Sequence, residues 1–349
     1  MTDIDIKSMY LEELKKLMEG EGEKAFHAGQ LFSWMHQKRA DSYEKMTNLS
    51  AKLREKLENS YPLTCLREVE CRISKKDGTR KYLFKLADGN VIESVWMKYH
   101  HGNSVCISSQ VGCAMGCRFC ASTIGGKVRN LQASEMLDQV YRIAELTGER
   151  VSNIVVMGTG EPFDNYENLL RFIRIVTDEK GMNLSIRNIT VSTCGLVPKM
   201  HDFAEEKLPV TLAVSLHAPN DEIRKKLMPV ANTYQIKEVV NAAKNYYEST
   251  GRRVTFEYAL AEGENDSVEN AQELAALLRG FPCHVNLIPV NPVEERSFRP
   301  ARYENTLNFQ NKLEKSRINV TIRREMGSDI DGACGQLRKS YIAQTKEEI

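Results

Sequence analysis

The chain has 349 residues, of which 42% are apolar and 27% are charged, and its formal net charge is +1. This length suits one large domain with an accessory domain, and the near-neutral charge excludes a uniformly basic nucleic-acid-binding chain. No apolar run reaches the ~18 residues of a membrane span, and the acidic start lacks a signal-peptide pattern. We therefore expect a cytoplasmic protein, in which nine cysteines indicate metal or redox chemistry rather than structural disulfides.

The first sixty residues follow a helical pattern. Leu11, Leu14 and Met18 recur at the spacing of one helix face, and further helices are expected at about 24–38 and 50–57. These segments predict a small helical domain. Its basic side chains would either contact RNA or form a solvated helix face.

The next forty residues change to the period of a strand. Tyr82 and Phe84 belong to an alternating pattern, and the pair Asp88-Gly89 predicts a turn before a second strand. Glu93 lies in that second strand among apolar neighbours. A carboxylate there is a candidate for acid–base chemistry, but on these residues alone an exposed strand edge is favoured.

From Val105 onward short apolar strands alternate with longer amphipathic helices, which predicts a parallel α/β sheet. With six or seven strands, the sheet would either close partly as a barrel or stay open and doubly wound. The expected strands are 105–108, 153–157, 187–192, 210–216, 254–258, 284–289 and 319–322. The expected helices are 133–146, 166–176, 237–247, 268–278 and 303–315.

Three cysteines, Cys113, Cys117 and Cys120, follow the first of these strands at the spacing C-x3-C-x2-C. Thiolates this close can hold one metal centre, whereas a structural zinc site and an ordinary cubane cluster need four ligands. No fourth cysteine completes the local set, so a cluster on these three would leave one iron open to a substrate. Three buried thiols, or a zinc site with a distant fourth ligand, are the alternatives.

Small polar residues and glycines follow the expected strands, where the carboxyl ends of parallel strands meet. Each one alone is explained by a turn or a cap, but together they suit a ligand with ribose hydroxyls, an amino-acid moiety and an adenine. They are Gly160, Glu161, Ser192, Ser215, Leu216, His217 and Asn291. For His217 we prefer a hydrogen-bonding role to metal ligation, with a structural role as the alternative.

Cys334 lies between small residues near the end of the chain, in a stretch where an accessible loop would allow thiolate chemistry. Cys106, seven residues before Cys113, could meet it. On the residues alone, two unrelated thiols are the favoured interpretation.

Several of these motifs together resemble the RlmN/Cfr family of radical S-adenosylmethionine (SAM) RNA methyltransferases over essentially the whole chain. The motifs are 106–113, the cysteines of 113–120, Gly158-Thr159-Gly160-Glu161-Pro162, 215–219 and 329–337. The resemblance implies an α/β fold with a partial (βα)6-type TIM barrel as the radical SAM core. It implies a helical RNA-binding domain at 1–60, a β-hairpin linker with Glu93 at 61–100, the core at 101–335 and a tail at 336–349.

Residue by residue, the resemblance implies that Cys113, Cys117 and Cys120 hold a [4Fe–4S] cluster. It also implies that SAM binds the seven residues listed above at the ends of the expected strands, from Gly160 to Asn291. It implies that a first SAM methylates Cys334, and that a second is cleaved to a radical that activates this methyl group. The methyl carbon would then join adenine in a transient protein–RNA crosslink. Glu93 would remove the proton, which reverses the expectation for this residue, and Cys106 would free the product by forming a disulfide with Cys334.

The implied target is C2 of an adenine at the peptidyl transferase centre of 23S rRNA, and an anticodon-loop adenine in a subset of tRNAs. The Cfr branch methylates C8 of the same rRNA adenine and gives antibiotic resistance. Pro162, Val111 and Gly332 favour the C2 branch, while Thr159 departs from the commoner Met or Ile. Another class of radical SAM enzyme, or a non-enzymatic iron–sulfur or zinc RNA-binding module, are the rival interpretations.

RNA contact is expected from local basic clusters, because the chain as a whole is nearly neutral. An electron donor such as flavodoxin or ferredoxin and a monomeric state are also expected. The clusters are Lys38-Arg39, then Arg118, Lys127 and Arg129, then Arg224-Lys225-Lys226, Arg252-Arg253 and Arg338-Lys339. For each cluster taken alone, a solvated face is favoured over an RNA contact.

Overall fold

The computed structural model describes residues 5–100, 102–293, 295–330, 335–338 and 341. Its central sheet contains β1 (Arg67–Ile73), β2 (Arg80–Lys85), β3 (Val91–Tyr99), β4 (Gly102–Cys106), β7 (Asn153–Val156), β8 (Ile189–Thr193), β9 (Thr211–Ser215), β10 (Thr255–Leu260), β11 (His284–Pro289) and β12 (Asn319–Ile322), in this spatial order. A separate pair is formed by β5 (Gln110–Gly112) and β6 (Lys127–Asn130).

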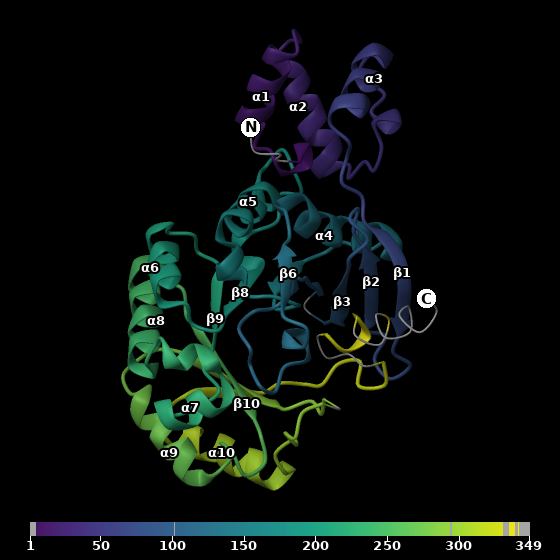
Figure 1. Ribbon diagram of the computed structural model, residues 1–349. Helices are drawn as coiled ribbons and strands as arrows, with labels where there is room; N and C mark the ends of the chain where they lie inside the picture. Colours follow the sequence, from purple (N-terminus) through teal and green to yellow (C-terminus); the bar gives the residue numbers. More distant parts are fainter. Residues whose placement is uncertain (1–4, 101, 294, 331–334, 339–340, 342–349) are drawn as a thin grey trace.

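Ten α-helices are found in the described residues (Figure 1). They are α1 (Leu11–Gly20), α2 (Phe26–Phe32), α3 (Ala51–Ser60), α4 (Ala133–Thr147), α5 (Tyr166–Thr177), α6 (Val197–Glu205), α7 (Asp221–Leu227), α8 (Ile236–Thr250), α9 (Val268–Leu277) and α10 (Tyr303–Lys315). The short helices α6 and α7 were not expected from the sequence, nor was the β5–β6 pair. None of the described helices is long and apolar enough to cross a bilayer.

The parallel part of the sheet is a partial barrel. From β4 to β12 the strands neighbour one another in sequence order and run parallel. A doubly wound sheet reverses its strand order at a switch point, and this sheet does not, so its connecting helices return over one face. In Figure 1, α6, α8, α9 and α10 follow the outside of the curved sheet. The predicted partial TIM-type barrel is therefore confirmed.

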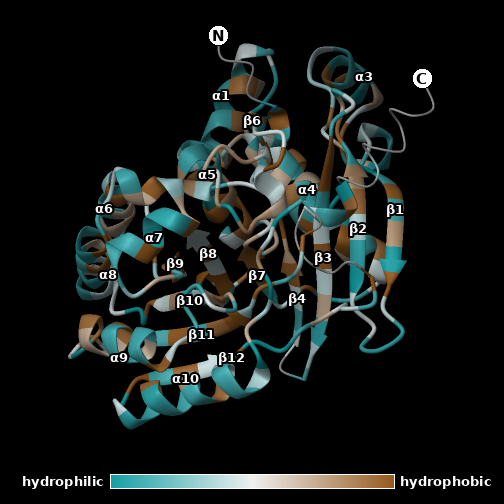
Figure 2. Cartoon of the chain, turned by 60° about the horizontal axis from the view of Figure 1, so that its bottom comes forward, coloured by the Kyte–Doolittle hydropathy of each residue, from teal (hydrophilic) through white to brown (hydrophobic). Residues whose placement is uncertain are grey.

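The hydropathy of the elements follows this arrangement. Figure 2 shows hydrophilic colour on the outward faces of α8, α9 and α10, whereas the strands they cover are largely apolar. Val191, Leu212 and Val285 are fully buried on central strands, as expected for a parallel sheet covered by helices.

Three antiparallel strands extend the sheet beyond β4. The predicted hairpin is present as β2 and β3, and it pairs with β4 through β3. The outermost strand, β1, was missed because its charged residues interrupt the apolar pattern, which is typical of an edge strand. Asp329 contacts this extension: it accepts hydrogen bonds from Ser74 Oγ (2.6 Å) and from the N–H of Lys75 (2.9 Å).

The helical domain is joined to the core by a buried polar seam. Lys7 Nζ lies 2.8 Å from Asp138 Oδ1 on α4, and both side chains are almost fully buried. Asp138 Oδ2 also accepts from the N–H of Leu66 (2.6 Å), where the chain leaves the helical domain. His36 is buried at the same seam against Tyr141 of α4. The predicted helices at 24–38 and 50–57 correspond to α2, which continues as a π-helical turn, and α3.

Candidate active site

The three-cysteine segment forms a loop that is closed at its base by β5 and β6. The N–H of Cys113 donates to the carbonyl of Gly126 (3.1 Å). Gly112 has φ +79°, and a Cβ at this position would lie 2.0 Å from the Gly126 carbonyl oxygen. Only glycine fits this close approach of two backbones. The tight closure fixes where the first cysteine enters the loop.

Hydrogen bonds within the loop hold the other two cysteines. The N–H of Cys120 donates to the carbonyl of Cys117 (3.1 Å). Thr123 Oγ1 donates to the carbonyls of both cysteines, at 3.1 Å for Cys117 and 2.9 Å for Cys120. The backbone carbonyls of both cysteines are thereby satisfied within the loop.

All three thiols line a cavity of about 140 Å³. The cavity lies at the carboxyl ends of β7, β8 and β9, because residues at or just after the end of each of these strands contribute to its wall. These residues include Gly158, Gly160, Glu161, Ser192, Ser215 and His217. The structure thus brings five of the seven predicted SAM residues together with the three cysteines.

The chemistry of this donor set fits an iron–sulfur cluster. Burial raises the pKa of the Cys113 thiol to about 12 and raises that of Cys117 further, and the neighbouring thiolates add to both shifts. Three thiolates at one buried place are therefore unfavourable unless a cation compensates them. The irons of a [4Fe–4S] cluster would supply that positive charge.

Glu161 is fixed at the cavity wall by backbone groups. Its carboxylate accepts from the N–H groups of Phe163 (3.0 Å) and Cys194 (2.7 Å). Burial raises the pKa of this carboxyl, and the two N–H groups oppose that shift. Gly160 beside it has φ +117°, and a Cβ there would lie 2.7 Å from Gln110 Cβ. Each carboxylate oxygen retains acceptor capacity for a ligand amino group.

His217 enters the site as a neutral ring. Its Nδ1 accepts from the N–H of Ala259 (2.9 Å), and Phe119 of the cysteine loop packs edge-on against it at 4.9 Å between ring centres. Burial lowers the pKa of His217 to about 3, so the ring proton resides on Nε2 at neutral pH. The ring therefore offers one hydrogen-bond donor, which supports the preferred interpretation over metal ligation.

Glu93 is buried, not exposed at a strand edge as the residues alone suggested. Its side chain is 4% exposed and lies 3.3 Å from Lys81 Nζ. The carboxylate accepts from the N–H groups of Gly335 (2.6 Å) and Arg338 (2.5 Å) near the C-terminus. The charged group thus has one cation and two backbone donors as partners inside the protein.

Gly335 also touches the cysteine loop. It has φ +84°, and a Cβ there would lie 2.7 Å from the backbone nitrogen of Ser122. Ser122 is two residues after Cys120 and lines the cavity of the three thiols. Glu93 and the cysteine loop therefore meet at Gly335. Cys334, the preceding residue, lies outside the described residues, and so does any pairing with Cys106.

Cys106 is at the end of β4, opposite Val95 in the register with β3. It lines a second cavity, of about 460 Å³, together with Val95 and Asn291. Asn291 is therefore in this neighbouring cavity and not in the one with the three thiols. Leu216 is fully buried and lines neither of these two cavities.

Comparison with known proteins identifies the family. The model of the radical SAM superfamily matches residues 107–275, and that of the ribosomal RNA large subunit methyltransferase N-terminal domain matches residues 4–62. A probable dual-specificity RNA methyltransferase RlmN from Lachnospira eligens is 61% identical over 343 residues, which cover 98% of both chains. This chain belongs to the RlmN family of radical SAM RNA methyltransferases.

A second RlmN relative, from Lachnoclostridium phytofermentans, is 63% identical over 342 residues, covering 98% of this chain and 96% of the relative. The crystal structure of a radical SAM methyltransferase from Sphaerobacter thermophilus superposes with a TM-score of 0.91 at 46% identity, covering 95% of this chain and 98% of that one. The protein is therefore a SAM-dependent RNA methyltransferase, and membership in the superfamily implies a [4Fe–4S] cluster and SAM.

The structure corrects the expectation of RNA contact for Arg224 and shows that Arg338 is partly engaged within the protein. Arg224 is fully buried, and its Nη2 donates to the carbonyl of Cys194 (2.7 Å). Arg338 is half-buried and its Nε donates to the carbonyl of Val91 (2.9 Å). Both side chains serve contacts within the RlmN-family fold, and Lys339 lies outside the described residues. RNA contacts by the remaining clusters stay predictions.

Sequence reasoning missed Gln139, which ties the elements of the site together. Its Oε1 accepts from Ser94 Oγ and from the N–H of Ser108, both at 2.8 Å, and its Nε2 donates to the Ser108 carbonyl (3.0 Å). Ser108 Oγ in turn donates to the carbonyl of Glu93 (2.7 Å) and accepts from the N–H of Thr159 (3.1 Å). A single glutamine on an amphipathic helix gives no signal of such a role.

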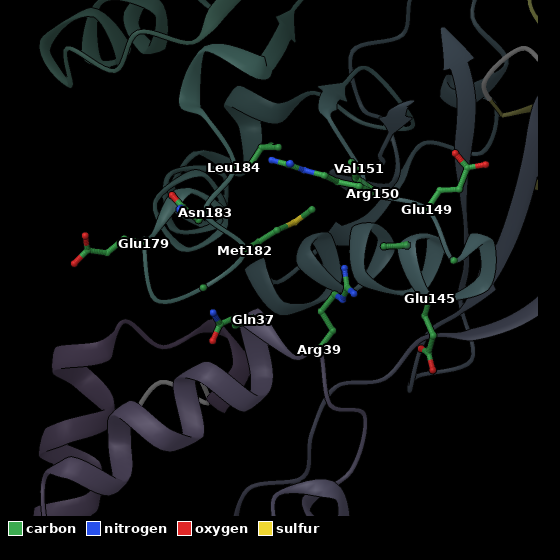
Figure 3. Close-up of a pocket in the computed structure, with 13 residues that line it drawn as sticks. Gln37, Arg39, Glu145, Glu149, Arg150, Val151, Glu179, Met182, Asn183 and Leu184 are labelled. Atoms are coloured by element: carbon green, nitrogen blue, oxygen red, sulfur yellow. The ribbon is translucent and has the colours of Figure 1, made fainter. Parts of the chain in front are cut away.

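A larger cavity, of about 620 Å³, lies at the opposite ends of the strands. It is lined by Val151, shortly before β7, and by Arg39 of the helical domain. In Figure 3, Arg39 and Arg150 point toward the middle of this cavity and Glu145 points away. Because the cysteines gather at the carboxyl ends of the same strands, this cavity is not part of the candidate active site.

Proposed function

We propose that this enzyme methylates C2 of an adenine at the peptidyl transferase centre of 23S rRNA, and of an anticodon-loop adenine in a subset of tRNAs. The contact of Glu93 with Gly335 carries the proposal. It brings a buried carboxylate beside the residue that follows Cys334, and Gly335 also packs against the cysteine loop. The relationship to proteins named RlmN supports C2 over C8.

Cofactor binding is assigned from the residues that line the two neighbouring cavities, together with Leu216, which is buried between Ser215 and His217 in sequence and lines neither cavity. Cys113, Cys117 and Cys120 would hold the [4Fe–4S] cluster. When bound, the cluster and SAM supply an organic radical, which is needed because the hydrogen on adenine C2 is not acidic. Two SAM molecules per turnover are proposed, one as methyl donor and one as radical source. SAM would bind Gly160, Glu161, Ser192, Ser215, Leu216, His217 and Asn291.

The chain's own residues would carry the methyl group and move the proton. Cys334 would carry the methyl group to the base and form the transient crosslink. Glu93 would accept the C2 proton, and its carboxylate is held in place by Lys81 Nζ and the N–H of Gly335. Cys106 would attack the sulfur of Cys334, so that an S–S bond forms as the bond from that sulfur to the product carbon breaks. An external thiol must then reduce the disulfide.

The RNA would bind as an unpaired, extruded base. An adenine inside a helix is inaccessible to a buried carboxylate, and enzymes that modify bases draw them out of the stack. The expected domains would then have separate roles. Residues 1–60 would contact the RNA, residues 61–100 would carry Glu93, residues 101–335 would form the catalytic core, and residues 336–349 would form the tail. A donor such as flavodoxin or ferredoxin would supply the electron.

Nucleoside mass spectrometry tests the proposal directly. The anaerobically reconstituted enzyme is incubated with SAM, a low-potential reductant, and unmodified 23S rRNA fragment or tRNA, and the digested RNA is compared with 2-methyl- and 8-methyladenosine standards. We expect 2-methyladenosine in both RNAs. The 8-methyl isomer would replace the C2 assignment by a Cfr-type activity, and neither product, from enzyme that cleaves SAM, would refute an adenine substrate.

The role of Glu93 has its own test. Glu93→Gln keeps the shape of the side chain but removes the proton acceptor, so product formation should fall by about 10²–10⁴-fold while the protein–RNA crosslink accumulates on denaturing gels. Glu68→Gln, on the exposed edge strand β1, is the matched control and should leave both readouts unchanged. Full product formation by Glu93→Gln would exclude Glu93 as the base.

A further inference from the structure

Arg224 on α7 is a fully buried cation that the site described so far does not use. It is the largest side chain among those with less than 2% exposure. Its Nη2 donates to the carbonyl of Cys194 (2.7 Å) and its Nη1 to that of Tyr234 (3.3 Å). Its Nε has no hydrogen-bond partner within the described part of the chain. The guanidinium stays protonated inside proteins, so a whole positive charge is buried here.

No carboxylate among the described residues pairs with this charge. Three titratable groups act on Arg224 electrostatically, in the order Cys194, Cys117 and Asp221. Asp221 has the smallest effect, and its Oδ1 accepts from the N–H of Ile236 (2.7 Å). Buried charges are normally paired, because an uncompensated one is strongly destabilising. Within the described part of the chain, the charge of Arg224 is therefore left uncompensated.

The guanidinium is held against the wall that carries Cys117. The N–H of Arg118, the next residue, donates to the carbonyl of Leu227 at the end of α7 (2.9 Å). Leu227 packs in one buried cluster with Cys117 and Cys194. A Cβ on Gly195 would lie 3.2 Å from Arg224 Nη2, so the guanidinium fills the space behind this part of the cavity. The contacts leave it little freedom to move away.

We propose that Arg224 is the built-in counter-charge of the iron–sulfur cluster and raises its reduction potential. This inference rests on the proposed binding of the cluster by Cys113, Cys117 and Cys120. A cluster held by three thiolates is anionic, and reduction by one electron adds one more negative charge. A fixed cation nearby stabilises the reduced form more than the oxidised form, and net charge is one of the levers that set cluster potentials.

The test compares variants that separate charge from hydrogen bonding. Arg224→Gln removes the charge and keeps donors, whereas Arg224→Lys keeps the charge and loses the planar fork. Lys225→Gln removes a charge from an exposed position on the same helix and is the matched control. Iron and sulfide are quantified in each anaerobically prepared protein, and the midpoint potential is measured by an electron paramagnetic resonance redox titration.

We expect the midpoint of Arg224→Gln to fall by at least the equivalent of a tenfold change in the equilibrium constant, which is about 59 mV for one electron. Arg224→Lys should retain most of the wild-type value, and Lys225→Gln all of it. Equal midpoints in Arg224→Gln and wild type, or an equal fall in Arg224→Lys, would overturn the proposal. Preparations without iron and sulfide would instead overturn the proposed cluster, and the role of Arg224 with it.

Thermal unfolding with and without the cluster provides a second test, because Arg224→Gln should change the stability in opposite directions in the two forms. Without the cluster, Arg224 is an uncompensated buried charge, so Arg224→Gln should be at least as stable as wild type. With the cluster bound, the same variant should be less stable than wild type. If the guanidinium only joined the carbonyls of Cys194 and Tyr234, Arg224→Gln would lose stability in both forms. A loss with the cluster but not without it would therefore contradict a purely structural role. A cluster-free Arg224→Gln that does not fold would likewise refute the counter-charge role.

Discussion

Two buried cations in different regions of the molecule are compensated in different ways. Lys7, at the seam between the helical domain and the core, is 1% exposed and pairs with the carboxylate of Asp138 at 2.8 Å. Arg224, behind the cysteine loop, is 0% exposed and has only backbone carbonyls as hydrogen-bond partners in the described residues. At the seam the polypeptide supplies both charges, whereas at the loop we propose that the iron–sulfur cluster supplies the opposite charge. The seam is therefore a structural feature and the loop a functional one.

The largest effect on stability is expected at the seam. Asp138→Asn keeps an acceptor for the N–H of Leu66 but leaves Lys7 as an unpaired buried charge, so the free energy of unfolding should fall by about 3–5 kcal/mol. Urea unfolding of the cluster-free protein, followed by circular dichroism, measures the change. Addition of Lys7→Met should recover most of the loss, because no buried charge then remains. A loss below about 1 kcal/mol for Asp138→Asn alone would mean that this buried pair contributes no more to stability than an exposed ion pair does.

The acid sensitivity of the seam provides a second, smaller effect. His36 is fully buried, and burial, followed by the charge of Lys7, lowers its pKa from 6.5 to about 3. Below pH 6.5 the unfolded chain binds a proton that the folded chain does not, so stability falls as the pH falls toward 3. His36→Phe should reduce this slope by about 1.4 kcal/mol per pH unit, measured by urea unfolding at several pH values between 4 and 6. An unchanged slope would mean that His36 is protonated in the folded protein.

The smallest effect is expected on the exposed side of α7, two residues from Arg224. Lys226 Nζ lies 3.0 Å from Glu222 Oε1, but the two side chains are 59% and 81% exposed. Such pairs contribute little because water and salt screen them, so Lys226→Ala should change the free energy of unfolding by less than about 0.5 kcal/mol. A chemical denaturation series at low and high salt checks this. A loss comparable to that of Asp138→Asn would show that exposure does not decide how much the ion pairs of Lys226 and Lys7 contribute to stability.

Much of the fold could be predicted, because its signals are local. The apolar period of strands such as β7 and β11, the amphipathic pattern of α4 and α8, and the turn between β2 and β3 each depend on residues close in sequence. Two of the missed elements lie where that signal is weak: α7 has only seven residues, five of them charged, and β1 has charges along an exposed edge. The direction of strand order, which decided between a barrel and a doubly wound sheet, is a property of the whole sheet.

By itself, the sequence determined the local chemistry: the spacing of Cys113, Cys117 and Cys120, and the small polar groups after successive strands, five of which line the cavity of the thiols. The tertiary structure alone decided which charges are buried. From the local residues alone, Glu93 was expected at an exposed edge and Arg224 on the protein surface, yet both are buried. The contact that defines the environment of Glu93 is with Gly335, 242 residues away along the chain. Burial and charge pairing depend on such distant segments, so no local pattern in the sequence reports them.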